Sequence, residues 1–212
     1  MTDLTVTQEY FVCAAAKNGK ISGTEKALCP VAAGLFELML EGLVRFENKQ
    51  IVPLVKVLPP EKATLEPLFR LLLSQKALNV EKLAQKYTFT NRNLKELVMS
   101  VGDALVKAGC ARRESALFGA VRYLPSHEAV DRVVNKLRAE LLEEGVITEE
   151  AALLAVLLDK SNQMKMFFSK YEQGEISQRR KALAATEAGR KTQDMIDHIY
   201  AMLTITTVLS TQ

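Results

Sequence analysis

Apolar residues recur along most of the chain at the three- and four-residue spacing of amphipathic helices. The segment 5–17 (TVTQEYFVCAAAK) begins on a threonine that suits a helix cap and is followed by an Asn-Gly stop, so it predicts a helix. A second helix is predicted over 30–41, because Pro30 fits a first turn and Gly42 follows as a stop. Further helices are predicted over 65–74, 80–87, 148–158, 163–171, 177–185 and 191–209.

Two segments depart from the helical pattern. The segment 43–54 (LVRFENKQIVPL) places two apolar runs around a polar centre, which predicts a hairpin closing around 47–49. The segment 110–124 (CARRESALFGAVRYL) looks like a second hairpin, with 113–115 near its turn. The sequence therefore contains at most two short β-hairpins among many helices.

These elements predict a mostly α fold. We expect one domain over 1–212, with a hydrophobic helical core surrounded by amphipathic helices and one or two short β-hairpins, because no Gly-, Ser- or Pro-rich linker divides the chain. About half of the residues (48%) are hydrophobic and 25% are charged, which is an ordinary balance for a globular protein.

Charge and cysteine content indicate the cellular location of the protein more clearly than its function. The net charge of +3 permits a basic patch but indicates neither nucleic acid nor lipid. Three cysteines without a Cys-x-x-Cys pair favour reduced thiols and a cytoplasmic location. The first ten residues do not follow the plan of a secretory signal, and the uncharged tract 199–212 is too short and too polar to span a bilayer. Membrane contact, if any, is predicted to be peripheral.

The sequence has no motif of a known catalytic site. It lacks a phosphate-binding glycine loop and a Gly-x-Ser-x-Gly elbow, and its two histidines, His127 and His198, are far apart. His127 fits a helix start and His198 a core position. Glu37 and Glu41 are four residues apart, and with no His or third acid beside them they fit a solvated helix face or a cap for nearby backbone better than an acid–base pair. Cys29 fits a small buried residue better than an activated thiol. We predict no enzyme, no metal site and no cofactor.

The order of helix, glycine and hairpin over 26–54 also occurs in winged-helix DNA-binding domains. A recognition helix at 30–41 would carry two glutamates and no Lys, Arg, Asn or Gln, and the wing would offer only Arg45 and Lys49. Nucleic acid is therefore not the expected partner, and a winged-helix-type DNA-binding protein is kept as the alternative.

The segments LTVTQEYFVCAAAKNGKI and ALCPVAAGLFELMLEGLVRFENKQIVPL, near the start of the chain, resemble the opening of the Golgi phosphoprotein 3 family. That family begins with a Leu-Thr-x-x-Glu-Glu-like helix and continues with a helix that ends Glu-Leu-x-Leu-x-Gly. The later segments LVKAGCARRESALFGAVRYLPS and EEAALLAVLLDKSNQMKMFF resemble the hairpin segment and the late core helix of the family. The matching residues near the start are Leu4, Thr5, Glu9, Glu37, Leu38, Leu40 and Gly42.

The resemblance implies a non-enzymatic, mostly helical protein of a divergent, bacterial-type branch. Eukaryotic members bind phosphatidylinositol 4-phosphate on the cytosolic face of the Golgi and hold glycosyltransferases there by their cytosolic tails. For this chain the resemblance implies a peripheral membrane adaptor that binds anionic lipid headgroups and an unknown protein client. It also implies a homo-oligomer formed through the 110–124 hairpin.

The lipid site of the family carries over only in part. Its tryptophan and its first arginine fall near Ser22 and Val31, so neither is present, and Lys26 is the nearest basic substitute. The Arg-Asn-x-Arg motif of the family is similar to RNLK, from Arg92 to Lys95, one helical turn away from the expected position. Alignment on the following glycine instead places Glu96 and Met99 at the motif.

Arg92 and Lys95 are three residues apart and project together from a helix. Arginine offers a planar fork and lysine a point charge for a phosphate, so these two with Lys26 are the candidate headgroup ligands. An ordinary solvated helix start is the other interpretation. The candidates for membrane contact or self-association at the second hairpin are Arg112, Arg113, Leu117 and Phe118. The two apolar members of that set fit a bilayer surface, a dimer interface or the core.

Overall fold

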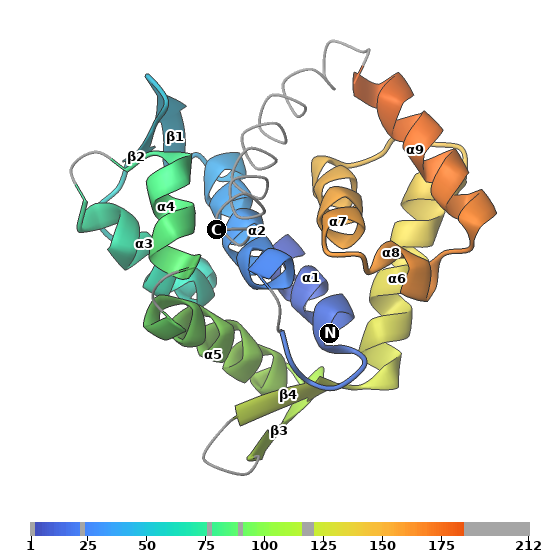
Figure 1. The fold of residues 1–212 in the computed structure, drawn as a ribbon, viewed down its shortest axis with the longest axis horizontal. Helices are drawn as coiled ribbons and strands as arrows, with labels where there is room; N and C mark the ends of the chain where they lie inside the picture. The colour runs from blue at the N-terminus through green and yellow to red at the C-terminus, as the bar shows by residue number, and fades with distance from the viewer. Residues whose placement is uncertain (1–2, 22–23, 76–77, 89–90, 116–120, 185–212) are drawn as a thin grey trace.

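The computed structural model describes residues 3–21, 24–75, 78–88, 91–115 and 121–184, and it is mostly helical (Figure 1). The elements in chain order are α1 (Val6–Ala15), α2 (Thr24–Leu40), β1 (Val44–Glu47), β2 (Gln50–Pro53), the 3₁₀ helix η1 (Pro60–Leu65), α3 (Glu66–Leu73), α4 (Val80–Thr88), α5 (Asn91–Lys107), β3 (Ala111–Ser115), β4 (Val121–Pro125), α6 (His127–Leu142), α7 (Glu149–Lys160), α8 (Met164–Phe167) and α9 (Lys170–Ala184).

Helices α1, α2 and α7 form the hydrophobic centre of the described structure. Helix α1 packs against α2, α5, α6 and α7, and in Figure 1 it lies with α2 between α3–α5 on one side and α6–α9 on the other. All residues from Ala151 to Leu158 of α7 are buried, as are Tyr10 to Ala15 of α1. The outer helices bury one stripe each; α3, for example, buries Leu68, Phe69 and Leu72. The predicted fold class, a hydrophobic helical core surrounded by amphipathic helices with two short hairpins, is confirmed.

The first hairpin forms where the sequence predicted it. Strands β1 and β2 are antiparallel, with Val44 opposite Pro53 and Glu47 opposite Gln50. The two connecting residues, Asn48 and Lys49, have φ angles of 50° and 63°. Positive φ at both central positions matches the right-handed twist of the flanking strands, which is why two-residue hairpins favour this turn.

The predicted start of the second helix at Pro30 is wrong. Helix α2 begins at Thr24, and Pro30 lies inside it, where proline removes one intrahelical hydrogen bond. The preceding turn buries Leu28 and Cys29 to 1% and 0% exposure, and this burial accounts for the continued helix. Cys29 is a small buried residue, as predicted.

Burial of α2 also overturns two other expectations. Glu37 is only 5% exposed, so it does not lie on a solvated face. The helix is buried from Leu28 to Leu38, whereas a recognition helix must be exposed to enter a DNA groove. The winged-helix alternative is therefore wrong for this segment.

The second hairpin exists, but its turn lies further along the chain. Arg113 pairs with Tyr123 across the β3–β4 hairpin, so it sits in the middle of a strand and not near the turn. The connection falls in 116–120, outside the described residues, together with the candidates Leu117 and Phe118.

The predicted helix over 163–171 is interrupted. Helix α8 ends before the extended Phe168, and α9 starts at Lys170. Ser169 and Glu172 explain the restart: the Glu172 carboxylate accepts from the Ser169 N–H at 2.7 Å, and the Ser169 hydroxyl accepts from the Glu172 N–H at 3.3 Å. This capping box satisfies two backbone donors at a helix start. The helix predicted over 177–185 is the later part of α9, and the one predicted over 191–209 lies outside the described residues, as does His198.

Two helix starts lie where the sequence predicted them. Thr148 caps α7 by accepting from the Ala151 N–H at 3.2 Å, as predicted. His127 is the first residue of α6, also as predicted. In the described part of the chain, no helix has both the length and the apolar character that crossing a bilayer requires.

Candidate functional site

Two arginines from different helices converge on one carboxylate. Arg70 of α3 and Arg92 of α5 each form an ion pair with Glu96, at 2.9 Å in both cases. The guanidinium of Arg70 reaches one carboxylate oxygen and that of Arg92 the other. The two arginine side chains are 63% and 83% exposed, so both keep free donors that face solvent.

These residues line an open cleft between α3 and α5, called here the α3–α5 cleft. Its lining consists of Pro67, Arg70, Arg92, Asn93, Glu96, Met99 and Ser100. Two hydrogen bonds to neighbouring backbone fix the walls. Asn93 donates to the carbonyl of Lys86 at 3.2 Å, and Ser100 donates to the carbonyl of Thr64 at 2.9 Å. The cleft is therefore a pre-formed basic surface.

The charges in the cleft are partly compensated. The hydrogen bond from Arg92 lowers the pKa of Glu96, with the nearby charges of Arg92 and Arg70 acting in the same direction. The carboxylate is therefore charged and shares the two guanidiniums, which leaves one net positive charge. An anion that enters the cleft must compete with Glu96 for the arginine donors.

The structure brings together only part of the predicted headgroup set. Arg92 lines the cleft, whereas Lys95 is exposed on α5 outside the lining. The side chain of Lys26 lies outside the described residues. Glu96 and Met99, the residues favoured by alignment on the glycine, line the same cleft as Arg92, so both alignments lead to one place.

Sequence reasoning missed Arg70. Arg70 and Glu96 are 26 residues apart and on different helices, so no local spacing signals their contact. The only hint in the sequence was that Arg70 lies in the predicted helix over 65–74. Val31, at the position of the family's first arginine, is fully buried and cannot take its place.

The hairpin candidates Arg112 and Arg113 have different surroundings. Arg112 pairs with Glu114 on its own strand at 3.0 Å, and Arg113 pairs with Asp103 of α5 at 3.4 Å. Whether this hairpin mediates self-association stays a prediction.

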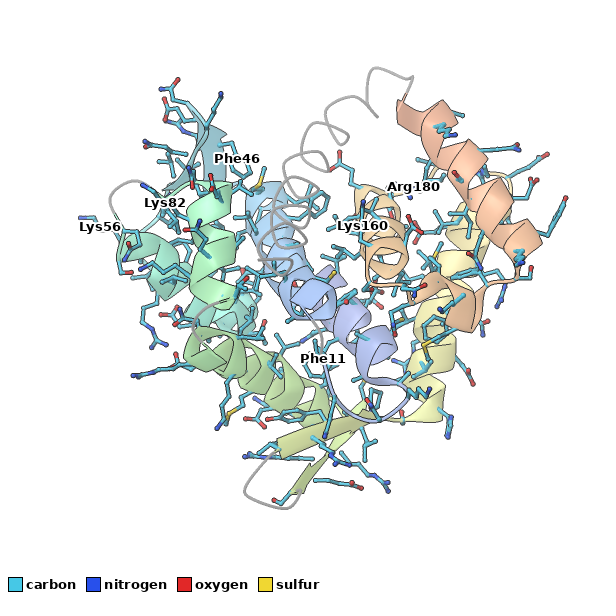
Figure 2. The ribbon with its side chains drawn as sticks, in the orientation of Figure 1. Phe11, Phe46, Lys56, Lys82, Lys160 and Arg180 are labelled. Atoms are coloured by element: carbon cyan, nitrogen blue, oxygen red, sulfur yellow. The ribbon has the colours of Figure 1, made fainter. Side chains whose placement is uncertain are left out.

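Tyr123 anchors the β3–β4 hairpin to the helical body. Its side chain is 1% exposed, and its hydroxyl donates to Asp103 at 2.8 Å. Its ring meets that of Phe11 edge-on, with centroids 6.0 Å apart, near the junction of α1, α5 and β4 (Figure 2). Burial, followed by the bond to Asp103, raises the pKa of Tyr123 to about 12. The hairpin is thus held in a fixed orientation.

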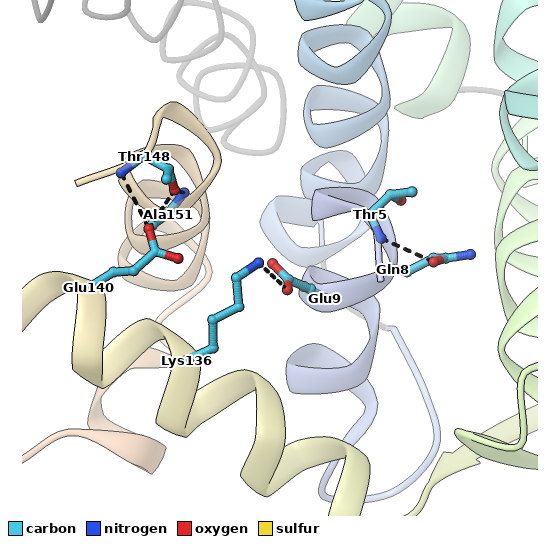
Figure 3. A network of polar contacts seen from close by, with 7 residues as sticks. All are labelled: Thr5, Gln8, Glu9, Lys136, Glu140, Thr148 and Ala151. Carbon is cyan, nitrogen blue, oxygen red and sulfur yellow. Dashed lines mark hydrogen bonds and ion pairs between the residues drawn. The ribbon is translucent and has the colours of Figure 1, made fainter. Parts of the chain in front are cut away.

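A second polar feature, the acidic cavity, lies among α1, α2, α6 and α7. It has a volume of about 330 Å³ and is lined by Leu4, Thr5, Val6, Glu9, Glu37, Leu40, Glu41, Lys62, Lys136, Glu140, Thr148 and Glu150. Figure 3 shows Lys136 of α6 reaching Glu9 of α1, and Glu140 reaching Thr148 at the start of α7. Five glutamates thus face two lysines.

The deepest charges of the acidic cavity are paired. Lys62 contacts Glu37 at 3.2 Å and Glu41 at 2.8 Å, and the Thr7 hydroxyl donates to Glu37 at 2.8 Å. Burial opposes the charge on Lys62, but the bonds to the two glutamates together outweigh it and raise its pKa. Burial also raises the pKa of Glu9, against the lowering effect of Lys136.

Comparison with known proteins identifies the family. The search of curated proteins found no match. The family model described as Golgi phosphoprotein 3 (GPP34) matches residues 7–199, which is nearly the whole chain. This match covers the α3–α5 cleft, both hairpins and most residues of α1 and of the acidic cavity. The chain therefore belongs to the Golgi phosphoprotein 3 (GPP34) family.

Proposed function

We propose that this protein is a non-enzymatic, peripheral membrane protein that binds anionic lipid headgroups in the α3–α5 cleft. The observation that carries the proposal is the convergence of Arg70 and Arg92 on Glu96 in an open cleft. Membership of the Golgi phosphoprotein 3 family supports it.

The cleft has the groups that a phosphate requires. Each guanidinium offers several N–H donors in a planar fork, and only part of each fork is taken by Glu96. A headgroup phosphate binds by accepting from both arginines, and Lys95 on the same helix adds attraction to an anionic surface. Each surface cation near such a bilayer contributes about 1 kcal/mol.

Headgroup selectivity is expected to be low. The chain contains no tryptophan, and the position of the family's first arginine is the buried Val31. Binding is therefore expected to follow total anionic charge more closely than the identity of the phosphoinositide. Lys26 remains a proposed further ligand.

The test is sedimentation with liposomes that are neutral, or that carry equal charge as phosphatidylserine or phosphatidylinositol 4-phosphate. The double variant Arg92→Ala/Lys95→Ala is expected to lose affinity about tenfold or more, and Arg70→Ala is expected to weaken binding as well. Arg45→Ala is the matched control, because Arg45 is an exposed arginine of the β1–β2 hairpin, away from the cleft, and is paired with Glu47 at 2.8 Å. Absence of binding to every anionic liposome at low salt would remove the membrane proposal.

A gain-of-binding variant tests the same cleft in the opposite direction. Glu96→Gln removes the competing carboxylate and frees both guanidiniums, so binding to anionic liposomes is expected to tighten. Glu47→Gln removes the same charge from the Arg45 pair and serves as the control. Equal gains from both variants would point to bulk charge and not to the cleft.

The adaptor role of the proposal concerns an unidentified protein client. The acidic cavity favours a client segment that carries a cationic side chain, because its lining has three more glutamates than lysines. Titration with an arginine-containing peptide and with its citrulline counterpart measures this preference. Equal affinity for both peptides would contradict it. We also propose that the 110–124 hairpin mediates self-association; sedimentation velocity is expected to show an oligomer, and a monomer at all concentrations would contradict this.

A further inference from the structure

A second basic feature lies at the base of the β3–β4 hairpin, away from the α3–α5 cleft. It is a cavity of about 690 Å³, called here the basic cavity, between the end of α1, the two strands and the start of α6. It is lined by Ala16, Lys17, Gly109, Ala111, Arg112, Leu124, Pro125, Ser126, His127 and Val130.

All ionisable side chains of this lining are basic. They are Lys17, which follows α1, Arg112 of β3 and His127 at the start of α6. Among the described residues of the lining, none carries a carboxylate. Three cationic or ionisable groups around one hollow give a local concentration of positive charge that the net charge of +3 does not reveal.

The nearest acids do not neutralise the cavity. Glu114 pairs with Arg112 at 3.0 Å, but the two side chains are 43% and 76% exposed. Such surface pairs contribute little, so Arg112 is able to exchange this partner for an anion. Glu128, next to His127, is turned to Arg132 at 3.7 Å.

Backbone hydrogen bonds hold the three walls together. The Ser126 N–H donates to the Cys110 carbonyl at 2.9 Å, and the Tyr123 N–H donates to the Gly19 carbonyl at 3.1 Å. The hairpin is thereby fixed both to the start of α6 and to the loop after α1. A site whose walls are already placed loses little entropy when it binds a ligand.

The start of α6 adds a favourable field. Ser126 caps the helix by accepting from the Ala129 N–H at 3.2 Å, and the 16-residue helix directs its positive end toward the lining. The positive helix end therefore adds to the attraction of the three basic side chains for an anion.

We propose that the basic cavity binds a phosphate monoester, with Lys17 and Arg112 as the principal ligands and His127 as the third. The dianionic charge of a monoester matches the number of basic groups better than the single charge of a phosphodiester. The group is either a lipid headgroup or a soluble phosphate. This inference does not rest on the proposed function, because the two sites share no residue.

Two experiments, one for each source of the phosphate, test the proposal. The soluble arm is an NMR titration of the isotope-labelled protein with inorganic phosphate at constant ionic strength. Amide shifts are expected around Ser126 and His127. Arg112→Ala and Lys17→Ala are each expected to weaken binding about tenfold or more, because each removes a hydrogen bond between charged groups. Arg113→Ala and Lys20→Ala are the matched controls, since these neighbours carry the same charges but do not line the cavity.

The membrane arm compares vesicles that contain phosphatidic acid, a monoester, with vesicles of equal charge that contain phosphatidylglycerol, a diester. Shifts with inorganic phosphate identify a site open to a soluble ligand, and preference for phosphatidic acid without them identifies a headgroup site. Either result requires that Arg112→Ala weaken binding more than Arg113→Ala. Equal losses in the two variants, or no response in both arms, overturn the proposal. Arg92→Ala/Lys95→Ala leaves phosphate binding at this cavity unchanged, which separates the outcome from that of the α3–α5 cleft.

Discussion

The contact between Gly102 and Tyr123 gives a prediction whose sign is unusual. Gly102 lies in α5, and a methyl group added to it would stand 2.6 Å from Cγ and from Cδ2 of the Tyr123 ring. In an exposed helix, glycine to alanine stabilises by about 1 kcal/mol. At Gly102 the opposite is expected, because the new methyl overlaps a ring that cannot move away.

The magnitude follows from how firmly Tyr123 is held. Its ring is 1% exposed, packs edge-on against Phe11, and is tied to Asp103 through its hydroxyl. Overpacking of such a site costs about 1–3 kcal/mol, and overlap with three ring atoms places it in the upper part of that range. After the gain in helix propensity is subtracted, Gly102→Ala is expected to lower the free energy of unfolding by about 1–2 kcal/mol.

The assay is urea unfolding followed by circular dichroism, with Gly174→Ala as the matched control. Gly174 lies in helix α9, is exposed, and has no described atom within 4 Å of an added methyl. Gly174→Ala is therefore expected to stabilise the protein or leave it unchanged. If Gly102→Ala stabilised the protein as much as Gly174→Ala, the Tyr123 ring would not pack over α5, and the anchoring of the hairpin described above would be refuted.

Three further predictions concern buried and capping charges. Lys62→Ala leaves the 5%-exposed Glu37 without its cation, so it is expected to lower the free energy of unfolding by about 3–5 kcal/mol. Recovery of stability in the double variant Lys62→Ala/Glu37→Gln, measured in the same urea assay, would support this, and a cost no larger than that of removing an exposed lysine would contradict it. Tyr123, with a pKa of about 12, is expected to ionise above the ordinary tyrosine pKa of 10.0 in an absorbance titration. Its contribution to stability is complete below 10.0 and is lost as pH rises toward 12. Glu172, whose pKa the backbone N–H of Ser169 lowers to about 2, is expected to stay charged in a carbon-detected NMR titration down to that pH. Its contribution to stability is present above its ordinary pKa of 4.5 and is lost as pH falls through 2; a titration midpoint near 4.5 would show that the capping box does not form.

Local patterns in the sequence predicted most of the elements. The polar centre of 43–54 gave the first hairpin because a two-residue turn depends only on the residues within it. Thr148 gave the start of α7 for the same reason, since a cap acts on the next turn. The capping box at Ser169 is equally local and is visible in the sequence Ser-Lys-Tyr-Glu at 169–172. The sequence therefore contained the signal that contradicts one unbroken helix over 163–171.

The errors arose where packing over long sequence distances decided the outcome. Pro30 has the local signature of a helix start, but the burial of Leu28 and Cys29 extends α2 beyond it. Glu37 has the local signature of a solvated residue, but Lys62 and Thr7, from η1 and α1, make its burial tolerable. Neither partner is near Glu37 in the sequence, so periodicity carried no information about them.

The candidate site shows the same division in one place. Arg92 was found because its neighbours on α5 resemble a family motif, whereas Arg70 was missed because it reaches the cleft from another helix. The competing alignment placed Glu96 and Met99 at that motif, and the structure puts all of these residues in one cleft. The alignments differed by one helical turn, and residues one turn apart share a helix face. The sequence could not predict the sign of the net charge in the cleft. That sign depends on Arg70, since Arg92 and Glu96 alone would cancel and leave a neutral pair with no attraction for a phosphate.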